Sequence, residues 1–165
     1  MHKSSVLSLR QIDTVSASKT KDYLFVGIQL LLFVAYAFEF PALSFSRPDV
    51  FGYLGLLLSV GGLCTGVLAL FQMKTSFSPF PTPITAGELV ITGMFAWARH
   101  PIYSSLLLGA FGFALYTDSG YRLLIGFSLL VLFYFKSSYE EQLLSARYPG
   151  YQDYQKEVGR FFRWS

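Results

Sequence analysis

Residues 50–73 read VFGYLGLLLSVGGLCTGVLALFQM and contain no charged side chain. At 1.5 Å per residue, a helix of this length extends about 36 Å, enough to cross the ~30 Å hydrocarbon core of a bilayer. Such a long apolar stretch is typical of a transmembrane helix, whereas buried helices of soluble proteins are usually shorter. This stretch therefore predicts a membrane protein.

The composition of the whole chain favours the same class. Of the 165 residues, 14% are charged, 53% are hydrophobic and 18% are aromatic, whereas about 25% of residues are charged in soluble domains. The mean hydropathy is +0.44. A soluble domain of this size would leave too much of its surface in water to hide this apolar area. A soluble core of buried helices is therefore the weaker interpretation.

Three further apolar stretches accompany the first. Together the four predict spans at about 23–40, 50–73, 101–117 and 119–138. The short Thr117-Asp118-Ser119-Gly120 segment predicts a tight turn, so the last two spans should form a helical hairpin. Arg122 and Lys136, near the ends of the fourth span, are expected to extend their charged groups to the interface. The predicted fold is an all-α integral membrane protein with about four transmembrane helices.

The positions of the cationic side chains predict the orientation. Eleven of the 13 Lys and Arg residues fall in segments 1–22, 74–100 and 136–165, and only Arg47 and Arg122 fall on the other side. Cytoplasmic segments of membrane proteins carry such an excess. Both termini and the loop 74–100 are therefore expected in the cytoplasm.

The two ends of the chain are polar. Segment 1–22 lacks the apolar core of a signal peptide. We expect it to be a loosely ordered cytoplasmic tail near the lipid headgroups. Segment 139–165 is expected to form a cytoplasmic amphipathic helix and tail.

The predicted hairpin brings distant polar residues to one face of the membrane. His100 precedes the third span, and Glu140 and Glu141 follow the fourth, so the chain crosses once in each direction between them. On a continuing helix, Glu140, Leu144 and Tyr148 would share one face. A site here would suit a charged cofactor from the cytosol and an apolar substrate from the bilayer.

Each of these features also has a structural explanation. Arg99-His100 could anchor a helix at the interface, and Glu140-Glu141 could be a solvated helix surface. Their convergence on one face favours a functional site. A metal site is not expected, because the chain has two histidines and one cysteine.

Gly62 and Gly66 in the second span have the spacing that lets helix backbones approach closely. The contact could lie between helices of one chain or between two copies. We favour packing within the chain, and the protein could be a monomer or a homodimer.

Two ordered blocks of sequence flank the predicted hairpin. The first contains Leu89-Val90, Gly93 and Arg99-His100-Pro101-Ile102-Tyr103; the second contains Glu140-Glu141-Gln142-Leu143-Leu144, Tyr148-Pro149-Gly150-Tyr151 and Arg160-Phe161. Together they resemble the isoprenylcysteine carboxyl methyltransferase family, whose signature phospholipid methyltransferases largely share. The resemblance covers about residues 75–162. One departure is Gly93-Met94-Phe95-Ala96, where members often read Gly-Pro-Tyr-Arg.

The resemblance implies a membrane-embedded enzyme that moves a methyl group from S-adenosylmethionine to a lipophilic small molecule, releasing S-adenosylhomocysteine. It implies cofactor-binding roles for Leu89, Val90, Gly93, Phe95, Arg99, His100, Tyr103, Glu140 and Tyr148. It implies catalytic roles for Glu140, Glu141, Arg147 and Arg160. No metal ion is implied.

Several functions remain open at this point. The resemblance favours a carboxylate acceptor, as in prenylcysteine, over an amine acceptor, as in a phospholipid N-methyltransferase. The alternatives are a membrane reductase of related architecture and a non-enzymatic four-helix transporter or scaffold. Of these classes, only a methyltransferase must bind S-adenosylhomocysteine. The expected partners are membrane lipids and the lipophilic substrate, and no nucleic acid.

Overall fold

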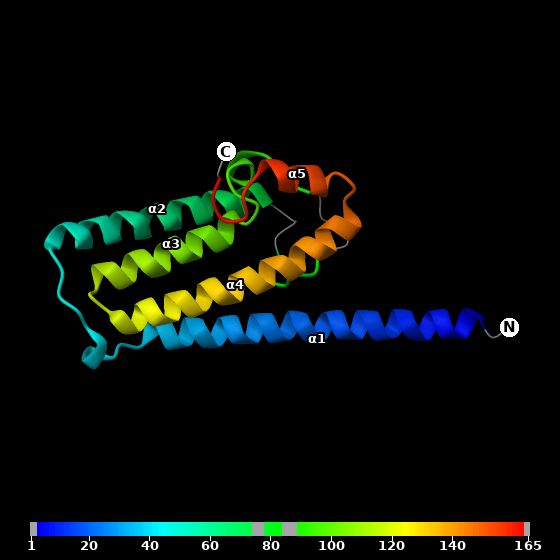
Figure 1. Ribbon diagram of the computed structural model, residues 1–165, viewed down its shortest axis with the longest axis horizontal. Coiled ribbons are helices and arrows are strands. Elements are labelled where there is room, and N and C mark those ends of the chain that lie inside the picture. The colour runs from blue at the N-terminus through cyan, green and yellow to red at the C-terminus, as the bar shows by residue number, and fades with distance from the viewer. Residues whose placement is uncertain (1–2, 74–77, 84–88, 164–165) are drawn as a thin grey trace.

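The computed structural model describes residues 3–73, 78–83 and 89–163 (Figure 1). These residues form helices and no named strand, so the all-α prediction is confirmed. The helices are α1 Lys3–Ala37, α2 Asp49–Met73, α3 Pro101–Tyr116, α4 Gly120–Arg147 and α5 Tyr151–Glu157, with 3-10 turns η1 Pro41–Leu43 and η3 Gly93–Ala96.

Three helical stretches are long and apolar enough to cross a membrane. They are Lys19–Ala37, Asp49–Met73 and Gly120–Arg147, and α3 is a shorter apolar helix of 16 residues. The protein is therefore an integral membrane protein, with α3 and α4 forming the expected hairpin (Figure 1).

The first segment differs from the expected loosely ordered tail, whereas the helix expected to continue past residue 138 is present. Residues 3–22 are not a loosely ordered tail but the first part of α1, which Figure 1 shows extending past the rest of the bundle. The reason is that no Gly or Pro interrupts this segment. At the other end, α4 continues to Arg147, and Tyr148 before Pro149 is extended, as residues before proline usually are.

Helices α2 and α3 pack backbone to backbone. A Cβ atom added to Gly62 would lie 2.7 Å from the Ser105 carbonyl oxygen, and one added to Gly112 would lie 2.5 Å from the Gly55 carbonyl oxygen. A Cβ atom on Gly66 would meet the Ser105 hydroxyl at 2.6 Å. These glycines therefore pack within the chain, as the sequence favoured.

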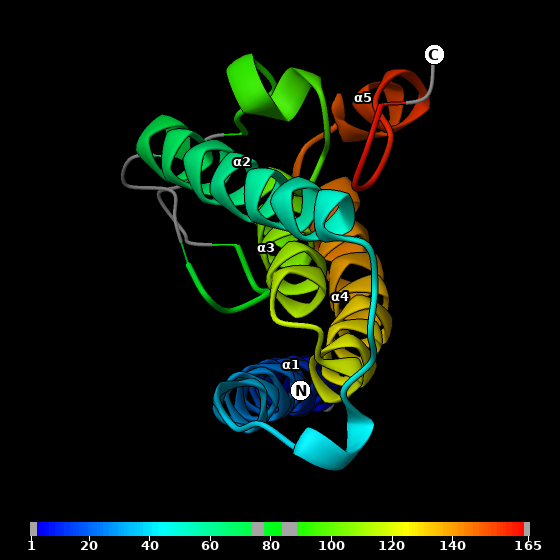
Figure 2. The same ribbon diagram turned by 90° about the vertical axis from the view of Figure 1, so that its left-hand side faces the viewer.

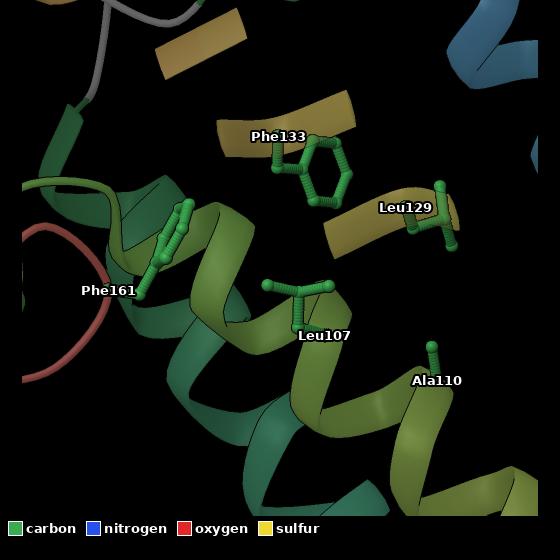
Figure 3. Packing of buried hydrophobic residues seen from close by; sticks show 5 residues of the cluster. All are labelled: Leu107, Ala110, Leu129, Phe133 and Phe161. Carbon is green, nitrogen blue, oxygen red and sulfur yellow. The ribbon is translucent and has the colours of Figure 1, made fainter. Parts of the chain in front are cut away.

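Helix α3 lies in the middle of the bundle, with α2 on one side, α1 on the opposite side and α4 beside it (Figure 2). The buried apolar core is formed by Leu107 and Ala110 of α3, Leu129 and Phe133 of α4, and Phe161 after α5 (Figure 3). The C-terminal segment is therefore part of the core.

The end of the bundle far from α5 is closed by ion pairs. Arg47 Nε lies 2.6 Å from an Asp118 carboxylate oxygen. Arg122 does not extend to the interface as predicted; it is 9% exposed and lies 3.4 Å from Glu39 and over the Phe113 ring. The Glu39 carboxylate and the Phe113 ring therefore contact the Arg122 guanidinium group in place of water.

Candidate functional site

The site is assembled where the start of α3 meets the segment after α5. The Arg99 backbone N–H donates to the Gly159 carbonyl (2.9 Å), and the His100 N–H donates to the Arg160 carbonyl (3.0 Å). These two bonds fix the residues before α3 against the C-terminal segment. They bring together residues about 60 positions apart in sequence.

Glu141 lies at the centre of this junction and is 5% exposed. Its Oε1 atom accepts from Arg99 Nε at 2.8 Å and lies 3.1 Å from His100 Nε2. Its Oε2 atom accepts from Arg160 Nη2 at 2.9 Å and from Gln155 Nε2 at 3.2 Å. With both oxygens occupied by protein donors, Glu141 organises the site.

Glu140 faces the opposite side of the same histidine. Its Oε2 atom accepts the Tyr103 hydroxyl at 2.9 Å and lies 3.7 Å from His100 Nδ1. The His100 and Tyr103 rings stack at 5.3 Å, and Tyr103 stacks in turn on Phe133 at 4.8 Å. The imidazole is therefore held between two carboxylates by an aromatic stack.

Two cavities meet at this histidine. We call the first the aromatic cavity. It is bordered by α5 and by residues 78–83, which we call the proline strap. Its other lining residues include Leu89, Val90, Phe95, Leu144, Tyr148, Tyr151 and Tyr154. The second, the inner cavity, has a volume of about 260 Å³ and reaches into the bundle along Gln29, Leu70, Ile102, Tyr103, Leu106 and Lys136. Both are lined by Met73, Ser78, Phe95, Arg99, His100 and Glu140.

Two buried tyrosines of α5 line the aromatic cavity. The Tyr154 hydroxyl donates to the Phe95 carbonyl, and burial raises the pKa of Tyr154 to about 12. Burial also raises the pKa of Tyr151 above its usual range. Both side chains are therefore neutral phenols at pH 7. The Tyr151 hydroxyl is buried and has no hydrogen-bond partner among the described residues, so it is available to a ligand.

The structure brings most of the predicted site residues together. Leu89, Val90, Phe95, Arg99, His100, Glu140 and Tyr148 line the aromatic cavity, and Tyr103 lines the inner cavity. Glu141 and Arg160 are not among the described residues that line either cavity, but they pair with each other, and Glu141 contacts Arg99 and His100, which do.

Gly93 and Arg147 are not among the described residues that line either cavity. Gly93 has a φ of +63° and packs against Gln72, whose Oε1 accepts the Met94 N–H at 2.7 Å. Exposed Arg147 donates to the Pro83 carbonyl at 3.3 Å and so holds the proline strap. Their observed contacts are structural.

Lys136 was missed as a site residue. It does not extend to the interface as predicted but is 1% exposed, and its Nζ donates to Gln29 Oε1 (2.6 Å) and to the Pro79 carbonyl (2.9 Å). Two signals were present in the sequence: Lys136 precedes Glu140 by one helical turn, and Gln29 is an amide within an apolar span. Tyr151 belongs to the second block of the resemblance, but neither it nor Tyr154 was predicted as a site residue.

The fold and the site define an integral membrane protein with a buried polar centre at one end of a helical bundle. The sequence pattern of the phospholipid methyltransferase family matches residues 50–150. The chain belongs to this family, which confirms the predicted membership.

Among solved structures, the chain is similar to the eukaryotic intramembrane Ras methyltransferase ICMT (isoprenylcysteine carboxyl methyltransferase), with a TM-score of 0.60 and 19% identity. The match covers 92% of this chain and 53% of that one, so the chain spans about half the length of that protein. At this identity the likeness shows the fold. No curated protein that we compared matches the chain.

Proposed function

We propose that the protein is an S-adenosylmethionine-dependent methyltransferase that acts on a lipophilic acceptor bearing a carboxylate. The observation that carries the proposal is that the aromatic cavity and the inner cavity meet at His100 and Glu140. Group transfer between two bound molecules requires their reacting atoms to come within about 3–3.5 Å. A shared wall between two neighbouring cavities supports such a reaction.

The residues of the aromatic cavity fit the cofactor. Aromatic faces attract a sulfonium ion by cation–π interaction, and Phe95, Tyr148 and Tyr151 line this cavity. The buried Tyr151 hydroxyl supplies a donor that lacks a protein partner among the described residues. Bound S-adenosylmethionine would supply a methyl group whose bond to sulfur breaks, with its electron pair leaving on sulfur, as an acceptor oxygen forms the new bond.

A carboxylate acceptor requires no base, because it is already a nucleophile at neutral pH. The task of the protein is then to orient the acceptor and exclude water. The stacked His100 and Tyr103 rings supply a rigid wall for this purpose. Buried Lys136 supplies a positive charge in the inner cavity.

An amine acceptor is the second candidate, favoured by the family match itself. An ammonium group must lose a proton before it can attack. Glu140 lines both cavities and is the carboxylate placed to accept that proton.

The orientation is part of the proposal. We infer that both termini and the site face the cytoplasm, as the distribution of Lys and Arg indicates. The N-terminal end of α1, the residues before α3 and α5 all lie at one end of the bundle (Figure 1), which supports this topology.

The first test is calorimetric titration of detergent-solubilised protein with S-adenosylhomocysteine. We expect binding that His100→Ala weakens at least about tenfold, because the imidazole lies at the wall between the cavities. The control is Lys156→Ala, which breaks an exposed ion pair on α5 and should leave the affinity unchanged. A wild-type protein that keeps its thermal transition but binds no S-adenosylhomocysteine would contradict the proposal. Titration with nicotinamide nucleotides would then test the reductase alternative.

A further inference from the structure

Lys136 joins three parts of the protein at the wall of the inner cavity. This residue of α4 is 1% exposed, and its Nζ donates to Gln29 Oε1 of α1 at 2.6 Å and to the Pro79 carbonyl of the proline strap at 2.9 Å. Nζ also lies over the Tyr103 ring of α3, 5.4 Å from the ring centre. Lysines near the end of a span usually extend their charge to water, so the inward position of this one calls for a physical reason.

Two carboxylates supply that reason. Glu140 and Asp22 both attract the Lys136 ammonium group electrostatically. In the part of the chain that the structure describes, neither forms an ion pair with Nζ shorter than 4.0 Å. Lys136 is therefore a counter-ion shared by an anion of α1 and an anion of α4, while its two hydrogen bonds go to neutral acceptors.

Asp22 is the less expected of the two anions. It lies near the start of the apolar stretch Lys19–Ala37 and is 6% exposed. Its Oδ1 atom is buried and has no hydrogen-bond partner among the described residues. A buried charge destabilises a fold strongly unless it is compensated. The Lys136 cation therefore supplies compensation that this oxygen does not receive from a hydrogen bond.

Glu140 requires a nearby cation for a different reason, namely its place at the wall between the two cavities. The neighbouring Glu141 carboxylate repels it, whereas Lys136 and a protonated His100 attract it. Its Oε2 atom accepts the Tyr103 hydroxyl at 2.9 Å. Lys136 precedes Glu140 by one turn of α4 and shares its face of the helix. The cation therefore stabilises the negative charge that Glu140 presents to both cavities.

The bond from Lys136 to Pro79 extends this arrangement to the proline strap. The strap contributes Ser78 to both cavities and Phe80 to the aromatic cavity. The Phe80 ring also packs edge-on against Tyr23 of α1, with 5.5 Å between the ring centres. Lys136 therefore holds one part of the cavity wall by a hydrogen bond and another part, Glu140, by charge.

We propose that Lys136 is a positioning residue of the cofactor site, with Asp22 of α1 as its counter-ion. Its ammonium group holds the Glu140 carboxylate and the proline strap in place at the wall shared by the two cavities. This inference rests on the proposed function, because the site that Lys136 organises is the proposed site of S-adenosylmethionine.

The test measures two quantities for each variant in detergent: the affinity for S-adenosylhomocysteine, by calorimetry, and the melting temperature. Lys136→Met keeps an unbranched side chain and removes the charge. It should weaken binding at least about tenfold, because Glu140 and the strap lose their shared partner. It should also lower the melting temperature by at least about 5 °C, because Asp22 becomes a buried anion without its counter-ion.

A second substitution separates binding from stability. Asp22→Asn removes the anion that Lys136→Met leaves uncompensated. In the Lys136→Met background it should recover at least about half of the lost melting temperature, whereas in the wild type it should not raise the melting temperature. Binding of S-adenosylhomocysteine should stay as weak as in Lys136→Met. A double variant that regains both stability and binding would show that Lys136 only stabilises the fold, and would overturn the positioning role.

The action of Lys136 through Glu140 is tested by a double-mutant cycle. If the cation positions Glu140, Lys136→Met should have at least about threefold less effect on S-adenosylhomocysteine affinity in Glu140→Gln protein than in the wild type. Equal effects in the two backgrounds would mean that the residues act independently, and would overturn the inference.

The matched control is Lys21→Met. Lys21 is an exposed lysine of α1 whose Nζ also lies over a tyrosine ring, 5.2 Å from the centre of Tyr139. It is not among the described residues that line either cavity. The same chemical change at this position should leave both the affinity and the melting temperature unchanged.

Unchanged affinity in folded Lys136→Met would also overturn the inference. If Lys136→Met does not fold by itself, the double variant with Asp22→Asn carries the affinity measurement. Failure of the proposed function has a different signature, namely wild-type protein that keeps its thermal transition and binds no S-adenosylhomocysteine. The two failures are distinguishable, because the first is measured on variants of a protein that binds this molecule and the second on the wild type.

Discussion

At the scale of single residues, the two neighbouring glutamates have different surroundings. Glu141 is surrounded by two arginines, a histidine and a glutamine, and both its oxygens accept protein donors. Glu140 borders both cavities and has one close protein donor, Tyr103, among the described residues. These two neighbouring glutamates thus differ in their surroundings, because Glu141 is held by protein donors and Glu140 faces both cavities.

Glu141→Ala should destabilise the protein severely. The substitution leaves the Arg99 and Arg160 guanidinium groups near each other without their shared carboxylate. Removing one partner of a buried ion pair costs about 3–5 kcal/mol, which corresponds to a melting temperature lower by about 6–20 °C at this size. Differential scanning fluorimetry in detergent measures the shift, with Lys156→Ala as the exposed-pair control. A shift below about 2 °C would refute the organising role.

Removing the hydroxyl group from each of the two buried tyrosines of α5 should affect the stability of the protein differently. Tyr154→Phe removes the donor to the Phe95 carbonyl and should destabilise the protein by about 1–2 kcal/mol. Tyr151→Phe removes a buried hydroxyl that has no partner among the described residues, so stability should be unchanged or higher. Calorimetry should show weaker S-adenosylhomocysteine binding for Tyr151→Phe. If Tyr151→Phe lowers the melting temperature as much as Tyr154→Phe does, the Tyr151 hydroxyl already has a partner.

At the scale of helices, adjacent glycines of α2 have different environments. A Cβ atom on Gly62 would lie 2.7 Å from the Ser105 carbonyl oxygen, whereas one on Gly61 meets nothing within 4 Å. Gly62→Leu should therefore separate α2 from α3 and lower the melting temperature by about 2–12 °C, as overpacking costs about 1–3 kcal/mol. Gly61→Leu makes the same chemical change one position away and should not. Equal melting temperatures for the two variants would contradict the backbone contact.

Much of this architecture could be predicted from the sequence. The uncharged stretch 50–73 predicts α2 almost to the residue, and Pro101 marks the start of α3 because its missing N–H is tolerated there. The meeting of His100 with Glu140 also followed from the hairpin, since two crossings return the chain to one face. These features depend on local composition and on helix length.

The rest depends on contacts between distant segments. The pairing of Lys136 with Gln29 joins residues 107 positions apart, and no periodicity in either helix specifies it. Near a span end, a lysine reads as an interfacial anchor unless its neighbours in space are known. The burial of Arg122 beside Glu39 has the same cause. The sequence alone thus locates the site but not the cation within it.

At the scale of the whole molecule, the orientation can be tested by labelling. The labelling variants start from a protein in which Cys64, the single native cysteine, is replaced by serine. A cysteine at Ser46, in the segment before α2, should react with a membrane-impermeant maleimide in intact cells. A cysteine at Gln152, in α5 at the opposite end of the bundle, should react only after permeabilisation. The reverse pattern would invert the proposed topology.

The backbone bonds from Arg99 and His100 to Gly159 and Arg160 also have a consequence for the timing of assembly. Chains emerge from the ribosome N-terminus first, at about 5–20 residues per second. All four apolar helices are therefore synthesised before residues 159–160, and a chain that ends before residue 159 has these helices but lacks the two backbone bonds that fix the residues before α3. A protein truncated before residue 159 should therefore keep its membrane helices but should not retain S-adenosylhomocysteine, which we propose that the full chain binds.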